Sequence, residues 1–99
     1  MDTSKLLNEE VITDRLQTLN VAWAAIGNDY LVRTYQTKDF DAGVALIKDI
    51  AKLANEANHH PDISLSYNRL EVKLSTHDIA GITDKDFALA AKIDQLAQS

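Results

Sequence analysis

Hydrophobic residues recur along this chain with two different spacings, and the longer spacing predicts three helices. Segment 40–57 has the clearest helical pattern, because its apolar residues form a wide stripe. A first helix is predicted from a cap at Asn8 to about Asn20. A last helix is predicted to start at Thr83, because Thr83-Asp84-Lys85-Asp86 resembles a capping box with Asp in the usual Glu position. The apolar stripe of segment 40–57 consists of Phe40, Val44, Leu46, Ile47, Ile50, Ala51, Leu53 and Ala54.

A spacing of two residues predicts four strands in two hairpins. The first hairpin joins segments 23–26 and 30–35, which are rich in aromatic and β-branched residues. Between them, 27–29 reads Gly-Asn-Asp, residues that tolerate the positive φ of tight turns. In the second hairpin, segments 63–67 and 70–74 alternate apolar and polar residues, so one face of that hairpin should be buried.

The order of elements predicts an α+β fold in which residues 1–99 form a single domain. Helix, strand, strand, helix, strand, strand and helix follow one another, which suggests a four-stranded antiparallel sheet with the three helices on one face. The other face of the sheet must then be solvated or covered by a partner. Tyr67 could stack on a ligand, but it is in phase with Ile63 and Leu65, so we expect its side chain in the core.

Composition narrows the class of protein. With 45% hydrophobic and 25% charged residues, the 99-residue chain is typical of a globular domain. Its formal charge of −5, with no basic stripe, disfavours direct nucleic-acid binding. The absence of cysteine excludes a disulfide framework, a thiolate nucleophile and cysteine-ligated zinc. No long apolar run indicates a signal peptide or a membrane span, so we expect no membrane partner and a cytoplasmic location.

All three histidines fall within 19 residues, in Asn58-His59-His60-Pro61-Asp62 and Ser75-Thr76-His77-Asp78. Pro61 cannot continue a helix, so the histidine pair should lie where the second helix gives way to a loop. The second hairpin folds back between the two segments, and therefore residues 58–60 and 75–78 should be close in space. Histidines can give and take protons near neutral pH, which suits a reaction that needs an acid and a base on opposite sides of one small molecule.

Each of these residues also has a plain structural interpretation. A lone histidine is more often a surface or hydrogen-bonded structural residue than a catalyst, although the convergence of three favours a functional site. Helical zinc sites favour a His-x-x-x-His spacing with supporting carboxylates, so the adjacent pair makes a metal less expected, and we predict neither a metal nor another cofactor. Asp84 and Asp86 are explained as first-turn acids that favour the positive end of the helix dipole.

A spaced set of residues resembles the signature of the pterin-4a-carbinolamine dehydratases, and the resemblance covers most of the chain. It implies the α+β fold, a homodimer or homotetramer, and a lyase reaction without a cofactor. The implied substrate is 4a-hydroxytetrahydropterin, which loses water to give the quinonoid dihydropterin. The set consists of His59-His60-Pro61, Tyr67, Ser75-Thr76-His77, Gly81 and Asp86, supported by 19–23, 33–35, 39–40, 86–90 and 93–94.

The same resemblance implies roles for individual residues. His59 and His77 would be the acid and the base, in an order that the sequence leaves open, while His60 would position the pterin and share in proton transfer. The implied substrate pocket is lined by Asn58, Pro61, Ser75, Thr76 and Asp78.

Asn55 departs from the family pattern. Four residues before the first histidine the family usually has a charged residue, often Glu. An uncharged amide cannot favour the protonated form of a neighbouring histidine as a carboxylate does. Glu56 is adjacent, but one residue along a helix rotates the side chain by about 100°, so it is not an obvious substitute.

Two other functions compete with this dehydratase. Relatives of the family act as binding partners, notably as a dimerisation cofactor for a homeodomain transcription factor, and a solvated sheet face would serve such a role. An enzyme of the same fold could also act on another pterin, in molybdopterin or folate metabolism. The three histidines favour catalysis, because a scaffold has no need of three titratable groups in one place.

Overall fold

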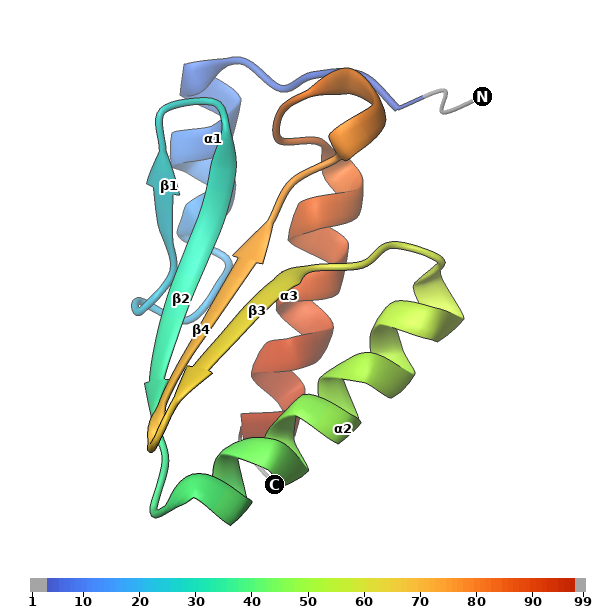
Figure 1. Ribbon diagram of the computed structural model, residues 1–99. Coiled ribbons are helices and arrows are strands. Elements are labelled where there is room, and N and C mark those ends of the chain that lie inside the picture. The colour runs from blue at the N-terminus through green and yellow to red at the C-terminus, as the bar shows by residue number, and fades with distance from the viewer. Residues whose placement is uncertain (1–3, 98–99) are drawn as a thin grey trace.

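The computed structural model describes residues 4–97, and its elements follow the predicted order (Figure 1). One short 3₁₀ helix, η1, was not predicted. The elements are α1 (Glu9–Leu16), β1 (Ala24–Ile26), β2 (Tyr30–Gln36), α2 (Phe40–Ala57), β3 (Asp62–Ser66), β4 (Arg69–Leu74), η1 (His77–Ile79) and α3 (Asp84–Ala97).

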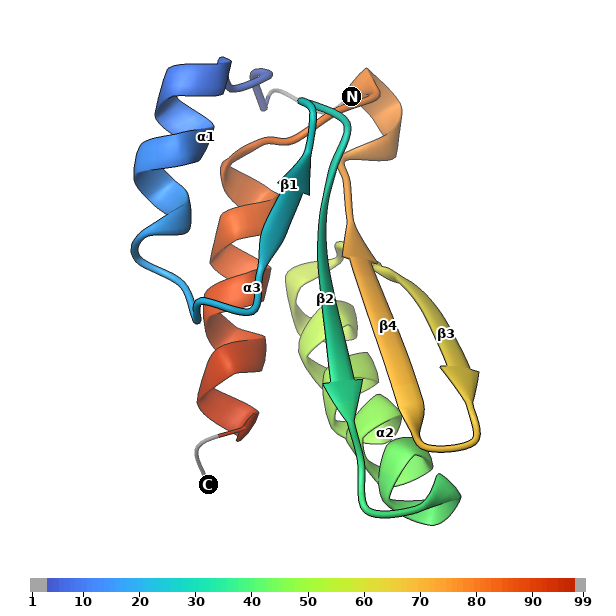
Figure 2. The same cartoon turned by 90° about the vertical axis from the view of Figure 1, so that its left-hand side faces the viewer.

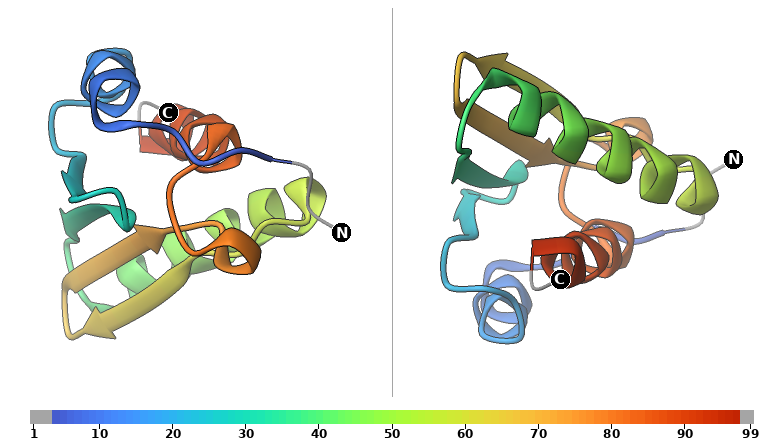
Figure 3. Two further views of the ribbon diagram at one scale, coloured as in Figure 1. Left: turned by 90° about the horizontal axis from the view of Figure 1, so that it is seen from above. Right: turned by 90° about the horizontal axis from the view of Figure 1, so that it is seen from below.

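The four strands form one antiparallel sheet in the order β1-β2-β4-β3. All three helices lie on one side of this sheet, and α3 runs between α1 and α2 (Figure 2 and Figure 3). The predicted α+β architecture is therefore confirmed. Because α2 leads directly into β3, and β4 leads through η1 into α3, the ends of α2 and β4 and the start of α3 are neighbours at one end of the molecule.

The hydrophobic core lies between the sheet and the helices. In β4, Leu70, Val72 and Leu74 are fully buried, whereas the alternate residues of the strand point to the solvent side. Ile50 of α2 and Ile93 of α3 close the core from the helical layer, both with no exposed surface. Burying a side chain of this size stabilises the fold by about 1.5–3 kcal/mol relative to leaving it in water. The buried side chains of the helices therefore hold them against the sheet.

The first helix is shorter than predicted. Asn8 caps it as expected, with its side chain accepting a hydrogen bond from the Val11 N–H at 2.9 Å. The helix nevertheless ends at Leu16 rather than near Asn20. The reason is tertiary, because the Asn20 N–H is drawn to the Asp94 carboxylate of α3 at 2.8 Å and leaves the helical path.

Tyr67 corrects the second hairpin. Strand β3 ends at Ser66, which pairs with Arg69, so only Tyr67 and Asn68 remain for the turn. Tyr67 adopts φ +49° there and is 66% exposed, so its predicted place in the core was wrong. The alternation of the sequence continues in phase through Tyr67, but a tight turn requires a residue outside the pleat.

Along the described residues, none of the helices combines the length and apolar character needed to cross a membrane.

Candidate active site

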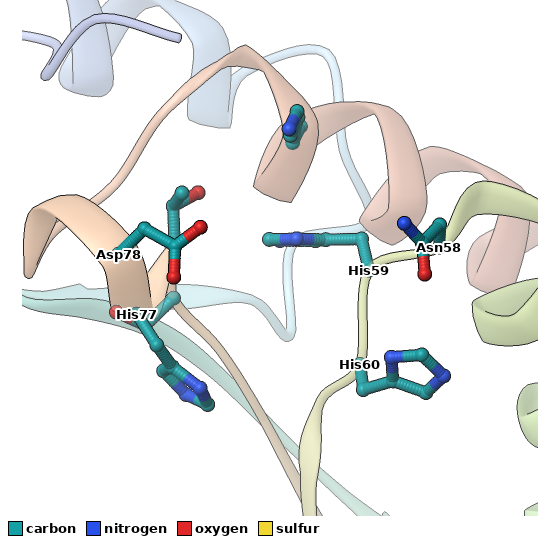
Figure 4. Close-up of a pocket in the computed structure, with 8 residues that line it drawn as sticks. Asn58, His59, His60, His77 and Asp78 are labelled. Carbon is teal, nitrogen blue, oxygen red and sulfur yellow. The ribbon is translucent and has the colours of Figure 1, made fainter. Parts of the chain in front are cut away.

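The three histidines line one cavity of about 390 Å³ at the end of β4 (Figure 4). The predicted convergence of segments 58–60 and 75–78 is therefore observed. Pro61 lies outside the lining, between the histidine pair and β3, and Lys85 of α3 joins the lining although the sequence reasoning did not select it. The cavity is lined by Asn58, His59, His60, Ser75, Thr76, His77, Asp78 and Lys85.

The end of α2 sets the directions of the histidine pair. Asn58 follows the helix in the left-handed conformation, with φ +51°, and the His59 N–H still bonds back to the Ala54 carbonyl at 3.1 Å. From this turn the two imidazoles diverge, and the His59 ring points toward the segment that carries Asp78 while the His60 ring points the opposite way (Figure 4). The pair is splayed, yet both rings line the cavity.

His59 is held by a buried carboxylate. Its Nε2 lies 2.6 Å from Asp86 Oδ1, and the two side chains are 10% and 0% exposed. The second oxygen, Oδ2, accepts hydrogen bonds from the Thr83 N–H at 2.9 Å and from the Thr76 hydroxyl at 3.0 Å. A carboxylate without water needs such partners, because an unpaired buried charge is very costly.

This contact assigns the hydrogen atoms of the His59 ring. An ionised carboxylate can only accept, so the hydrogen of neutral His59 is on Nε2, and Nδ1 is left as an acceptor. The Thr76 hydroxyl, which donates to Asp86, is itself 2.6 Å from the Thr83 hydroxyl, and the latter accepts from the Lys85 N–H at 3.2 Å. The hydrogen bonds thus run in one consistent direction toward Asp86.

His77 has the opposite environment. It lies in η1, its side chain is 61% exposed, and its Nε2 is 3.5 Å from Asp62 Oδ2. The loop that carries it is closed by hydrogen bonds between the backbones of Thr76 and Gly81, including Thr76 N–H to Gly81 C=O at 2.8 Å. Gly81 is required in this place because a Cβ would lie 3.1 Å from the Asn28 carbonyl oxygen and closer still to Leu6.

His60 contacts the residue that departs from the family pattern. Its Nε2 lies 3.0 Å from Asn55 Oδ1, one turn back along α2. The amide oxygen can accept a hydrogen bond from the ring, but it supplies no charge. Position 55 therefore touches a histidine, as the resemblance implied.

Sequence reasoning missed two contributions to this site, the contact of Asp86 with His59 and the place of Lys85 in the cavity lining. The capping box predicted for Asp86 is confirmed by its bond to the Thr83 N–H, but a cap uses one oxygen and nothing in the sequence showed where the other points. Lys85 precedes it in the first turn of α3 and had no signal of its own. Within residues 4–97, no group of three or more His, Asp or Glu side chains is arranged to hold a metal ion.

Comparison with known families and proteins gives a consistent result. A family model described as "Pterin 4 alpha carbinolamine dehydratase" matches residues 5–96. A protein of Chloroflexus aggregans named "Putative pterin-4-alpha-carbinolamine dehydratase" is 44% identical over 90 residues, which cover 91% of this chain and 95% of that protein. A protein of the same name from Thermomicrobium roseum is 45% identical over 91 residues, covering 92% and 96%.

Two solved structures resemble the fold. One is a crystal structure described as a transcriptional coactivator/pterin dehydratase from Brucella melitensis, with a TM-score of 0.87, 30% identity, and coverage of 94% of this chain and 99% of that one. The other is a pterin dehydratase-like protein identified as a RuBisCO assembly factor in the alpha-carboxysome. It matches with a TM-score of 0.64 and 22% identity, covering 79% and 92%, and shows a similarity of fold alone.

Proposed function

This chain belongs to the pterin 4 alpha carbinolamine dehydratase family, and from that premise we propose that it removes water from a 4a-hydroxytetrahydropterin to give the quinonoid dihydropterin. The observation that carries the proposal is the single cavity lined by all three histidines, one of which is held by a buried carboxylate. A histidine paired with a buried carboxylate at the wall of a cavity is typical of catalytic sites.

The reaction moves two protons and breaks one bond. The hydroxyl on C4a receives a proton and leaves as water when the C4a–O bond breaks. N5 loses its proton, and the electrons of that N–H bond form the C4a=N5 double bond. The step is redox-neutral, so an acid and a base of suitable strength are sufficient, and such help typically contributes about 10²- to 10⁴-fold in rate.

The surroundings of the two outer histidines support a division of roles. His59 has Nδ1 as its free acceptor, and Asp86 stabilises the imidazolium that forms when Nδ1 takes a proton, so we assign His59 as the base at N5. His77 is 61% exposed, so water can resupply its proton, and we assign it as the acid at the 4a-hydroxyl. Exchange with water then returns each ring to its starting state.

The other lining residues bind the flat heterocycle. His60 lies on the opposite side of the mouth from His77 and positions the ring. Asn58, Ser75, Thr76 and Asp78 offer amide, hydroxyl and carboxylate groups that can pair with the donors and acceptors of a pterin edge. Pro61 contributes by fixing the backbone after the histidine pair rather than by contact.

A stopped-flow ultraviolet measurement tests the proposal directly. The decay of 4a-hydroxytetrahydropterin is followed with and without the protein, and the spontaneous reaction supplies the baseline. We expect acceleration at catalytic concentrations of protein. Folded protein that leaves the spontaneous rate unchanged would overturn the dehydratase and shift the weight to a binding role or to a pterin of molybdopterin or folate metabolism.

A non-catalytic binding role is the second candidate. It is favoured by the relative described as both a coactivator and a pterin dehydratase, and by large hydrophobic side chains that are exposed on this chain, such as Val21 at 97%. A homodimer or homotetramer would cover part of that surface, and we retain this assembly and a cytoplasmic location as predictions. Light scattering gives the mass of the assembly, and a chain that is monomeric at micromolar concentration would contradict it.

A further inference from the structure

The loop that carries His77 is fixed mainly at its base. None of the residues of η1 is buried, and Ala80 after it takes the left-handed conformation, with φ +55°. At the base, the Thr76 N–H donates to the Gly81 carbonyl at 2.8 Å, and the Gly81 N–H donates to the Thr76 carbonyl at 3.4 Å. Because η1 lies between these two residues, their pairing sets the direction in which the His77 ring leaves the backbone.

Two distant segments of the chain hold this base. Ile82, the next residue, donates its N–H to the Asn28 carbonyl at 3.2 Å, and its own carbonyl accepts from the Leu7 N–H at 3.0 Å. The segment that leads into α1 therefore crosses the chain between η1 and α3 at this point (Figure 1 and Figure 3). Leu6 adds a side-chain contact, because a Cβ on Gly81 would lie only 2.5 Å from Leu6 Cδ2.

Leu6 is placed to support the loop without lining the histidine cavity. It is 56% exposed, and it is absent from the residues that form the cavity wall. The covered part of its side chain rests on Gly81, whose backbone makes both hydrogen bonds of the loop base. A backbone hydrogen bond that water can reach opens more readily than a covered one, so the methyl groups of Leu6 protect the base from opening.

We propose that Leu6 is a positioning residue for His77, because its side chain holds Gly81 in place and thereby fixes the loop that presents the imidazole to the cavity. The consequence for the rate rests on the proposed function, since it assumes that His77 delivers a proton to the pterin. A catalytic group that is held less firmly reaches the productive geometry less often, and a misplacement of about 1 Å can cost about 10²-fold in rate. The other lining residues still bind the substrate, so kcat should change more than KM.

Truncation of Leu6 tests this role with two independent measurements. Leu6→Ala removes partly buried carbon atoms, and the loss corresponds to about fivefold in the equilibrium for opening of the loop base. Hydrogen exchange followed by NMR should therefore be about fivefold faster at the N–H groups of Thr76 and Ala80, and unchanged in the buried part of α2. Stopped-flow kinetics should show kcat lower by at least about threefold, with KM nearly constant.

Val21→Ala is the matched control. Val21 is also a large exposed hydrophobic residue, at 97%, and it lies between α1 and β1, at the opposite end of β1 from the turn that holds Ile82. Its truncation should alter neither the loop exchange nor kcat. Leu6→Met keeps an apolar side chain of similar volume that can fill the same gap, so it should restore most of both values.

The outcomes separate this positioning role from the dehydratase. Unchanged exchange at Thr76 and Ala80 in Leu6→Ala, or faster exchange throughout α2 as well, would overturn the role whatever the rate of dehydration. Faster exchange confined to the loop, but with wild-type kcat, would also overturn it. Faster loop exchange in a protein that never accelerates dehydration would support the hold of Leu6 on the loop and overturn the proposed reaction instead.

Discussion

At the scale of single residues, His59 and His77 share a cavity but differ in almost every other property. His59 is nearly buried and has a carboxylate partner at 2.6 Å, while His77 is mostly exposed with a partner at 3.5 Å. The same ring can act as an acid or as a base, and its partners and its contact with water decide which role suits it. Removal of the two rings should therefore have different effects on the stability of the protein.

Truncation of these histidines should separate activity from stability. His77→Ala should lower the dehydratase rate by more than about tenfold and leave the free energy of unfolding unchanged, because the ring is exposed. His59→Ala should lower the rate similarly but also cost about 1–3 kcal/mol of stability, because Asp86 loses its donor. Stopped-flow rates and urea unfolding measure both quantities. Wild-type rates in both variants would refute the acid-base assignment.

Asn55 offers a gain-of-charge test at the same scale. In Asn55→Glu a carboxylate replaces the amide that contacts His60 at 3.0 Å, and it should favour the protonated form of that ring. We expect activity to stay the same or rise. Lys52→Gln, on the exposed side of the same helix and outside the cavity, also makes the net charge one unit more negative and controls for that change. A fall in activity in Asn55→Glu alone would mean that the amide itself is needed at this position.

At the scale of elements, the start of α3 has two functions. Asp86 caps the helix through one oxygen and orients His59 through the other. The start of α3 thus supports the side chain of His59, which follows the end of α2. Such a positioning residue needs no contact with substrate to affect the rate.

Asp86→Asn tests this double function. An amide can still cap the helix, but its NH₂ group would donate to His59 and place the ring hydrogen on Nδ1, so the base would be lost. We expect the rate to fall by about tenfold or more and the pH–rate profile to lose the limb that reports the base. Asp84→Asn is the matched control, since it removes one charge from the same turn at a side chain that is 75% exposed and paired with Arg15. Equal losses in both variants would attribute the effect to charge rather than to the contact with His59.

The elements also show how far local pattern reaches. Helix α2 was predicted with its observed bounds because its wide apolar stripe spans the whole helix. The end of α1 and the place of Tyr67 were missed, since a distant carboxylate decided the first and strand register decided the second. The 3₁₀ helix that carries His77 depends on the pairing of Thr76 with Gly81, which no periodicity reveals.

At the scale of the whole molecule, a second polar cluster joins the sheet to α3. Asp94 accepts hydrogen bonds from the Trp23 indole at 2.7 Å and from Arg33 at 2.6 Å. The Arg33 guanidinium stacks on the Tyr35 ring at 4.2 Å. The pKa of Tyr35 is raised to about 12, because burial and the Asp94 carboxylate raise it by more than the Arg33 guanidinium lowers it. Among the described residues, the Tyr35 hydroxyl has no hydrogen-bond partner.

Tyr35 should make global stability depend on alkaline pH. An unfolded tyrosine ionises near 10, so between about pH 10 and 12 the unfolded state loses this proton first. The stabilisation is complete below pH 10 and decreases as pH rises toward 12. Tyr35→Phe should abolish this decrease and change stability at pH 7 by no more than about 1 kcal/mol, since no hydrogen bond is lost. Urea unfolding of both proteins at pH 7 and 11 gives the difference, and parallel curves would contradict the prediction.

The sequence by itself determined the order of elements, the apolar faces that form one core, and the convergence of two histidine segments around a hairpin. These follow from periodicity, caps and turn residues, which act over a few positions along the chain. Only the tertiary structure decided that Asp86 holds His59, that Asn55 meets His60, and that the segment before α1 holds the base of the η1 loop. Hydrogen bonds and contacts of this kind depend on atoms brought together from distant segments, and their direction is set by packing rather than by spacing.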